Sequence, residues 1–86
     1  MTVLFYGNVQ EYTSGEKSTE VEDAPNIRAL IELLGRHFGA QFKEFLLGDD
    51  TCFFLVNGSG IMTTGGLRTP LRRDDTVEVL PFVNGG

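Results

Sequence analysis

The sequence predicts one small α+β domain with two layers: a mixed sheet of four to five strands packed on one main helix and a short second helix. Three observations lead to this prediction. Segments rich in β-branched and aromatic residues lie at both ends of the chain. One strongly amphipathic helical segment lies between them, and 86 residues provide only one hydrophobic core. Because one main helix cannot cover both faces of a sheet, two layers are expected.

The N-terminal part is predicted to form two paired strands and the main helix. The first strand covers residues 2–6, and the second covers residues 18–22 after a polar loop. Asn26 can cap the first helical turn with its side-chain oxygen. Gly39 is expected to stop the helix in a left-handed conformation, and Gly35 inside it costs about 1 kcal/mol relative to alanine. The apolar residues recur at helical spacing on one face, at Ile27, Leu30, Ile31, Leu34 and Phe38.

The middle of the chain is predicted to add a short helix and a hairpin. A helical turn at residues 42–46 is expected to fold over the core. Residues 51–56 are apolar on both faces, which indicates a central strand. The pair Asn57-Gly58 favours a tight turn into a short return strand at residues 59–62.

The last strand is predicted at residues 76–80. Pro81 cannot donate a hydrogen bond to a ladder, so we expect it to end regular pairing. The predicted organisation is a domain at residues 1–80 followed by a flexible tail at residues 81–86. Two N-terminal strands, a crossing helix and a last strand beside the first are the β-grasp arrangement.

Composition and charge exclude several classes of function. The net charge of −5 disfavours binding to nucleic acid and to anionic membranes. A single cysteine, Cys52, allows no internal disulfide and no four-cysteine metal site, and its apolar neighbours indicate a buried, inert thiol. The start of the chain has neither a basic region nor a long apolar run, so we expect a cytoplasmic protein without a membrane span.

The residues that could carry catalysis are few and scattered. His37 is the only histidine, which rules out a pair of histidine metal ligands, and it lies at a predicted helix end. The adjacent carboxylates Asp49-Asp50 and Asp74-Asp75 are interpreted as solvated turn residues, with a paired acid and base as the alternative. The glycine-rich segments match no phosphate-binding loop. We therefore expect no catalytic site, no metal and no bound cofactor.

The most informative feature is the pair Gly85-Gly86 at the end of the chain. Two glycines add no side-chain bulk, so such a tail can thread a narrow channel and present the Gly86 carboxylate inside another protein's active site. Hydroxide is a poor leaving group, and the carboxylate must be activated before it reacts as an acyl donor. The chain has no visible ATP site, so a partner enzyme would use ATP to activate it. The tail residues before the glycines are Val83 and Asn84.

Along its whole length the chain resembles the ubiquitin-like sulfur carriers of the MoaD/ThiS type. The resemblance is carried by the N-terminal strand, the helix entry at residues 26–31, Phe54-Leu55-Val56-Asn57-Gly58, residues 65–71, residues 74–81 and Gly85-Gly86. The family tail often has a second proline and a small residue where this chain has Phe82 and Asn84. The loop Gly65-Gly66-Leu67 is similar to the longer-loop branch, which includes archaeal-type modifiers and carriers for cysteine synthesis.

The resemblance implies a β-grasp fold and a defined reaction at Gly86. A MoeB/ThiF-like enzyme would adenylate the carboxylate, which is then converted to a thiocarboxylate. In the molybdopterin branch a MoaE-like large synthase subunit receives the tail, and this chain would be the non-catalytic small subunit. The alternatives are a carrier for thiamine or cysteine synthesis, a protein modifier joined to lysines, and a plain interaction domain.

Large apolar side chains near the start of the tail are candidate docking residues for such partners. We place Phe54 or Phe53, Leu80 and Phe82 on this surface. Packing in the core is an equally good interpretation of Phe53 and Phe54, whereas Phe82 lies beyond the last predicted strand and favours docking.

Overall fold

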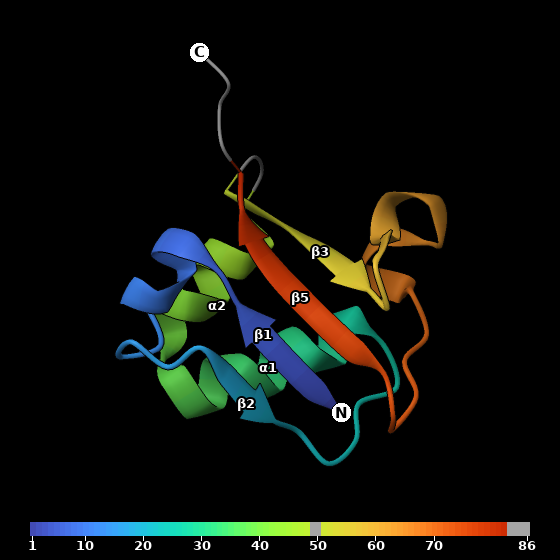
Figure 1. Ribbon diagram of the computed structural model, residues 1–86, viewed down its shortest axis with the longest axis horizontal. Helices are drawn as coiled ribbons and strands as arrows, with labels where there is room; N and C mark the ends of the chain where they lie inside the picture. The colour runs from blue at the N-terminus through green and yellow to red at the C-terminus, as the bar shows by residue number, and fades with distance from the viewer. Residues whose placement is uncertain (49–50, 83–86) are drawn as a thin grey trace.

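The described part of the chain folds into one mixed sheet with two α-helices behind it (Figure 1). The computed structural model describes residues 1–48 and 51–82. The sheet has the strand order β2-β1-β5-β3-β4. Its strands are β1 (Thr2–Phe5), β2 (Ser18–Glu20), β3 (Cys52–Val56), β4 (Ser59–Gly60) and β5 (Thr76–Pro81). The helices are α1 (Ile27–Phe38) and α2 (Ala40–Leu47), with the 3₁₀ turns η1 (Gly7–Glu11), η2 (Ile61–Thr63) and η3 (Gly66–Arg68).

The topology is the β-grasp arrangement that the sequence predicts. β1 is antiparallel to β2 and parallel to β5, with Val3 opposite Val77. β5, rather than the predicted strand at residues 51–56, is the central strand. β3 pairs with β5 on one side and only with the two residues of β4 on the other. A central position in the sheet therefore does not explain why both faces of β3 are apolar.

Helix α1 forms for the reasons that the sequence indicates. The Asn26 side-chain oxygen accepts a hydrogen bond from the Ala29 amide at 2.9 Å, which caps the first turn. Gly39 ends the helix with φ +118° and ψ 162°, so its φ is positive but it does not adopt the predicted left-handed helical geometry. α2 begins at the next residue, because this extended conformation turns the chain sharply between the two helices. The buried residues of α1 are Ile27, Leu30, Ile31 and Leu34.

Gly35 has a packing reason that the sequence does not reveal. A Cβ atom at this position would lie 2.8 Å from Cβ of Lys43 in α2. The two helices approach each other more closely here than an alanine in α1 allows. Lys43 then extends outward, and its Nζ lies 2.9 Å from a Glu32 carboxylate oxygen.

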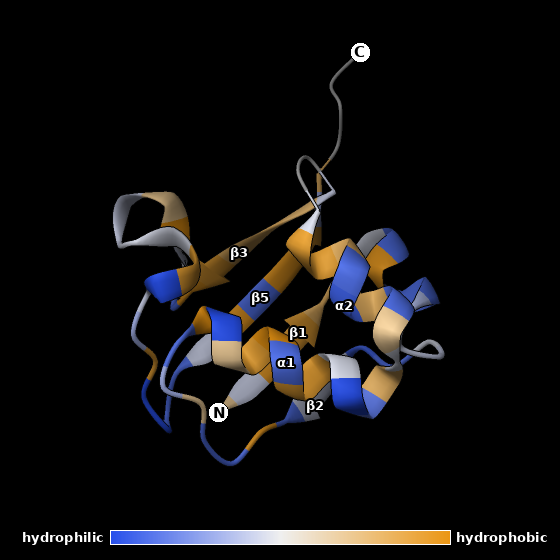
Figure 2. Cartoon of the chain, turned by 180° about the vertical axis from the view of Figure 1, so that it is seen from behind, coloured by the Kyte–Doolittle hydropathy of each residue, from blue (hydrophilic) through white to orange (hydrophobic). Residues whose placement is uncertain are grey.

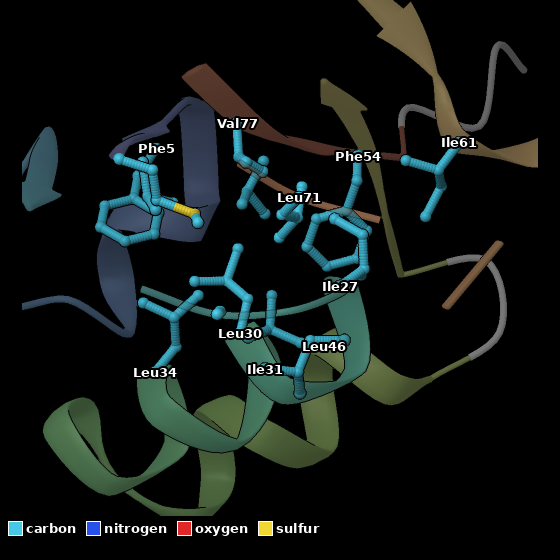
Figure 3. Close-up of a cluster of buried hydrophobic side chains, with 14 of the residues drawn as sticks. Phe5, Ile27, Leu30, Ile31, Leu34, Leu46, Phe54, Ile61, Leu71 and Val77 are labelled. Carbon is cyan, nitrogen blue, oxygen red and sulfur yellow. The ribbon is translucent and has the colours of Figure 1, made fainter. Parts of the chain in front are cut away.

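The core is a single layer between the sheet and the helices (Figure 3). Phe5 from β1 makes edge-on contacts with Phe38 and Phe42, at ring-centroid distances of 5.6 and 5.7 Å. Because both helices lie on the same side, the opposite face of β1, β5 and β3 is left uncovered (Figures 1 and 2). That uncovered face, called the outer face below, is continuous with the end of β5 that leads into the tail.

Candidate functional site: the end of strand β5 and the outer face

The last strand extends one residue further than predicted. Pro81 belongs to β5 and lies opposite Cys52, and the Phe82 amide donates to the Thr51 carbonyl at 3.1 Å. The expectation that Pro81 ends regular pairing is therefore wrong. In an antiparallel ladder, residues alternate between facing the partner strand and facing away. The backbone nitrogen of Pro81 points away from β3, so the missing N–H of proline costs no hydrogen bond with that strand.

Pro81 is held from the other side by Gly7. A Cβ atom added at Gly7 would lie 2.8 Å from the Pro81 ring carbon Cγ, and Gly7 has φ +59°. The Tyr6 amide donates to the Val79 carbonyl at 3.1 Å just before this contact. The residues Leu80–Phe82, called the tail root, are thus fixed between β3 and the start of η1.

The residues predicted to carry the chemistry follow the tail root. Val83, Asn84, Gly85 and Gly86 lie outside the described residues, as does the pair Asp49-Asp50. Their predicted roles stay predictions.

The outer face is apolar next to the tail root and polar at its other end. Strand alternation places Leu80 opposite Phe53 on this face, and Glu78 in one row with Leu4 and Leu55. Phe82 is 48% exposed and Phe53 is 42% exposed. At the far end the same face carries Thr2, Thr76 and Glu20. The apolar half of the outer face, as used below, consists of Leu4, Tyr6, Phe53, Leu55, Leu80 and Phe82, with Glu78 among them.

The structure corrects one of the predicted docking residues. Phe54 is only 4% exposed and points from β3 into the core toward the helices (Figure 3). It therefore does not share a surface with Leu80 and Phe82. Phe53, the other candidate in the sequence, takes this place, because successive side chains in a strand point to opposite faces. Figure 2 shows that β3 is apolar along its length, so hydropathy cannot tell the two residues apart.

A hollow of about 650 Å³ opens beside the tail root, at the edge of the sheet where β4 stops. Phe53 and Phe82 line it together with Leu47 and Met62, which is 88% exposed. Leu47 and Met62 are not among the docking residues that the sequence predicts. Leu47 directly follows the predicted helical turn at residues 42–46, and Met62 ends the predicted return strand at residues 59–62. In the structure that strand stops at Gly60, and Met62 lies in η2. An apolar side chain at the end of a predicted element is the signal that indicates both residues.

One carboxylate interrupts the apolar half. The Tyr6 hydroxyl donates to Oε2 of Glu78 at 2.8 Å. This hydrogen bond raises the pKa of Tyr6 above its ordinary value, with further contributions from desolvation and then from the negative charge of Glu78. The phenol therefore stays protonated and keeps the carboxylate in place.

The other groups that could carry chemistry have structural surroundings. Burial raises the pKa of the Cys52 thiol, and its Sγ lies 3.9 Å from the Leu46 carbonyl oxygen, so it is a poor nucleophile. The His37 ring packs edge-on against Phe38, with a centroid distance of 4.5 Å. Within residues 1–48 and 51–82, no three histidine, cysteine, aspartate or glutamate side chains are grouped to hold a metal ion.

Asp75 is a structural residue of the turn before β5. Its carboxylate accepts hydrogen bonds from the Arg72 amide at 2.8 Å and from the Asn57 side chain at 2.9 Å. These bonds hold the pKa of Asp75 below its usual value. The contacts fit the turn interpretation of Asp74-Asp75 rather than an acid–base pair. In the part of the chain that the structure describes, no helix has the length and apolarity needed to cross a membrane.

Comparisons with known proteins agree with this architecture. The model of the ThiS family matches residues 3–86. A chain from the Amycolatopsis orientalis BexX/CysO complex is 27% identical, with a TM-score of 0.84 over 99% of this chain and 98% of that one. Mycobacterium tuberculosis CysO is 25% identical, with a TM-score of 0.84 over 95% and 98%.

A further similar structure is a complex of two proteins. A chain from the complex of subunits 1 and 2 of the Helicobacter pylori molybdopterin-converting factor is 26% identical, with a TM-score of 0.66 over 99% of this chain and 96% of that one. No curated protein sequence matches this chain significantly. The family match spans nearly the whole chain, and the predicted resemblance is confirmed. The chain therefore belongs to the ThiS family, and its β-grasp body is that of a ubiquitin-like sulfur carrier or modifier.

Proposed function

We propose that the chain is a sulfur carrier whose Gly86 carboxylate is activated by a MoeB/ThiF-like enzyme. A carboxylate oxygen attacks the α-phosphorus of ATP, pyrophosphate leaves, and an acyl adenylate forms. A sulfide donor then attacks the acyl carbon, the bond to AMP breaks, and a thiocarboxylate remains. The observation that carries the proposal is the ThiS family match, which extends through Gly85-Gly86, beyond a strand whose last residue, Pro81, packs closely against Gly7.

In this proposal the folded body serves only to bind partner enzymes, and the chain has no catalytic site of its own. ATP is bound by the activating enzyme, and the apolar half of the outer face supplies the docking surface. Phe53 and Phe82 are the strongest anchors, because large exposed aromatic residues next to a functional tail are typical of binding hot spots. We further propose that the protein acts in the cytoplasm.

The leading pathway is molybdenum cofactor biosynthesis, with the chain as the small subunit of molybdopterin synthase. A MoaE-like large subunit would receive the tail and transfer its sulfur to a pterin precursor. The similarity to a chain in the complex of molybdopterin-converting factor subunits 1 and 2 supports this assignment.

A sulfur carrier for another pathway, such as cysteine or thiamine synthesis, is the second candidate. The body superposes more closely on CysO, with a TM-score of 0.84, than on the molybdopterin-converting factor chain, with 0.66. One of these CysO structures is a complex with a different protein, BexX. Conjugation to lysines, as in a protein modifier, is the remaining alternative.

Intact-mass spectrometry tests the proposal. The chain is expressed with its activating enzyme and a sulfur donor, and conversion is expected to replace one carboxylate oxygen by sulfur. Deletion of Gly86 is the control and is expected to abolish the change. A chain that is never adenylated and never gains sulfur contradicts the proposal. Transfer of the sulfur to a pterin precursor or to another acceptor distinguishes the pathways, and isopeptide-linked Gly85-Gly86 remnants on other proteins would indicate a modifier.

A further inference from the structure

Glu78 is the one charged residue in the apolar half of the outer face. It lies in the central strand β5, in one row with Leu4 on β1 and Leu55 on β3. Leu80 follows two positions later on the same face. Covering a carboxylate in the middle of an otherwise apolar docking surface costs desolvation free energy. A carboxylate at this position therefore indicates a specific role.

The carboxylate is only partly satisfied within the protein. The Tyr6 hydroxyl donates to Oε2 at 2.8 Å. Among the described residues no donor lies within hydrogen-bond distance of Oε1, and no lysine or arginine within 4 Å pairs with this carboxylate. In the free protein water solvates Oε1. Tyr6 also fixes the side chain against the sheet, and the carboxylate therefore has a defined position on the face.

Covering this face changes the energetics of Glu78. Removing a carboxylate from water without a partner costs several kcal/mol, far more than one neutral hydrogen bond returns. A partner that docks on Leu80, Phe53 and Phe82 must therefore offer a donor to Oε1 or be rejected. A cationic donor is the best match, because the chain carries a net charge of −5 and attracts basic surfaces.

We propose that Glu78 selects the partner: the enzyme that docks on the outer face places an arginine or lysine over Glu78, surrounded by apolar residues that cover Phe53, Leu80 and Phe82. Tyr6 is a positioning residue that holds the carboxylate for this ion pair. The inference rests on the proposed function, since it concerns the enzyme that activates the tail.

The pair supplies selectivity as well as affinity. A related enzyme whose apolar docking surface lacks the cation would leave Glu78 buried and unpaired, which rejects it without any steric clash. A carrier with an uncharged residue at this position would in turn leave the enzyme's cation unpaired. The ion pair would therefore discriminate in both directions.

The test is steady-state ATP–pyrophosphate exchange by the ThiF-type activating enzyme of the same organism, with the full chain as the varied substrate. For Glu78→Gln, which keeps the size and the Tyr6 contact, we expect KM to rise about tenfold while kcat changes less than about twofold. Glu78→Lys is expected to raise KM further, and Tyr6→Phe to have an intermediate effect. The KM of the wild type is expected to rise with salt, and that of Glu78→Gln to respond less.

Glu20→Gln is the matched control. Glu20 is also a strand carboxylate held by a hydroxyl, since the Thr2 Oγ1 donates to it at 2.6 Å, but it lies at the polar end. Its KM is expected to stay within about twofold of the wild-type value. Thermal unfolding of each variant checks that the fold is retained. Restored exchange by Glu78→Lys with an enzyme whose facing cation is changed to glutamate would identify the ion pair directly.

The outcomes separate the two ideas. If wild type and Glu78→Gln react with the same KM and the same salt dependence, this inference is overturned and the sulfur-carrier proposal stands. If the wild type supports no exchange and gains no sulfur with any activating or acceptor enzyme, the proposed function fails and the inference fails with it.

Discussion

Phe53 and Phe54 are neighbours in β3, yet one is 42% exposed on the outer face and the other is 4% exposed in the core. The side chains are the same, and the strand is the same. The difference arises because both helices lie on one side of the sheet, so alternate residues meet either helices or solvent (Figures 1 and 3). Apolar residues on the inner face stabilise the fold, and those on the outer face are available for binding.

The strongest test of this contrast is truncation of each phenylalanine. Phe54→Ala removes a ring packed among core residues and is expected to lower the free energy of unfolding by about 3–5 kcal/mol. Phe53→Ala is expected to change it by less than about 1 kcal/mol, since its ring is half in solvent. Urea unfolding followed by circular dichroism measures both. Equal losses for the two variants would show that the outer face is not free in solution.

A second test concerns the junction between the body and the tail. Gly7→Ala forces a Cβ into the Pro81 ring and imposes a positive φ on alanine, so we expect a loss of about 1–3 kcal/mol in the free energy of unfolding. Pro81→Ala removes the ring that the new methyl group meets. The double variant is expected to recover part of the loss, and a double-mutant cycle measures that coupling. If the stability losses of the two single variants simply add in the double variant, the cost of Gly7→Ala does not come from contact with Pro81.

The outer face itself is tested by binding rather than by stability. Phe53→Ala and Phe82→Ala are each expected to weaken binding to the activating enzyme by about 1–2 kcal/mol, because they remove anchors beside the tail. Isothermal titration calorimetry gives the affinities. Met62→Ala serves as a comparison at the far rim of the hollow, where we expect a smaller effect. Unchanged affinity in both phenylalanine variants would place the docking surface elsewhere.

The smallest expected effect is at Asp75, which supports β5 from the turn before it. Its lowered pKa means that its stabilising contribution is present above the unfolded pKa, about 3.9, and is lost as the pH falls through the lower folded value. Asp75→Asn is therefore expected to cost about 1 kcal/mol at pH 7 and progressively less below about pH 4. Thermal unfolding from pH 3 to pH 7 measures this, with Asp74→Asn as the control. If the stability difference between the wild type and Asp75→Asn did not change with pH, the charge of Asp75 would not contribute to it.

Much of the fold could be predicted because its signals are local. The Asn26 cap and the spacing of Ile27, Leu30, Ile31 and Leu34 define α1 without reference to the rest of the chain. The turn at Asn57-Gly58 was predicted from its residue types, and both residues have positive φ. The class of function follows from the Gly85-Gly86 end together with the resemblance to the MoaD/ThiS type that the neighbouring motifs carry.

What the residue pattern alone could not decide depends on which segments meet. Gly35 looks like a defect in a helix until Lys43 of α2 is placed against it, and Pro81 looks like a strand terminator until its position in the ladder and its contact with Gly7 are known. Hydropathy treats Phe53 and Phe54 alike, and it gives Glu78 no role beyond solubility. The surroundings of all these residues are decided by contacts between segments far apart in the chain, because packing and strand register, unlike capping and periodicity, are properties of two segments rather than one.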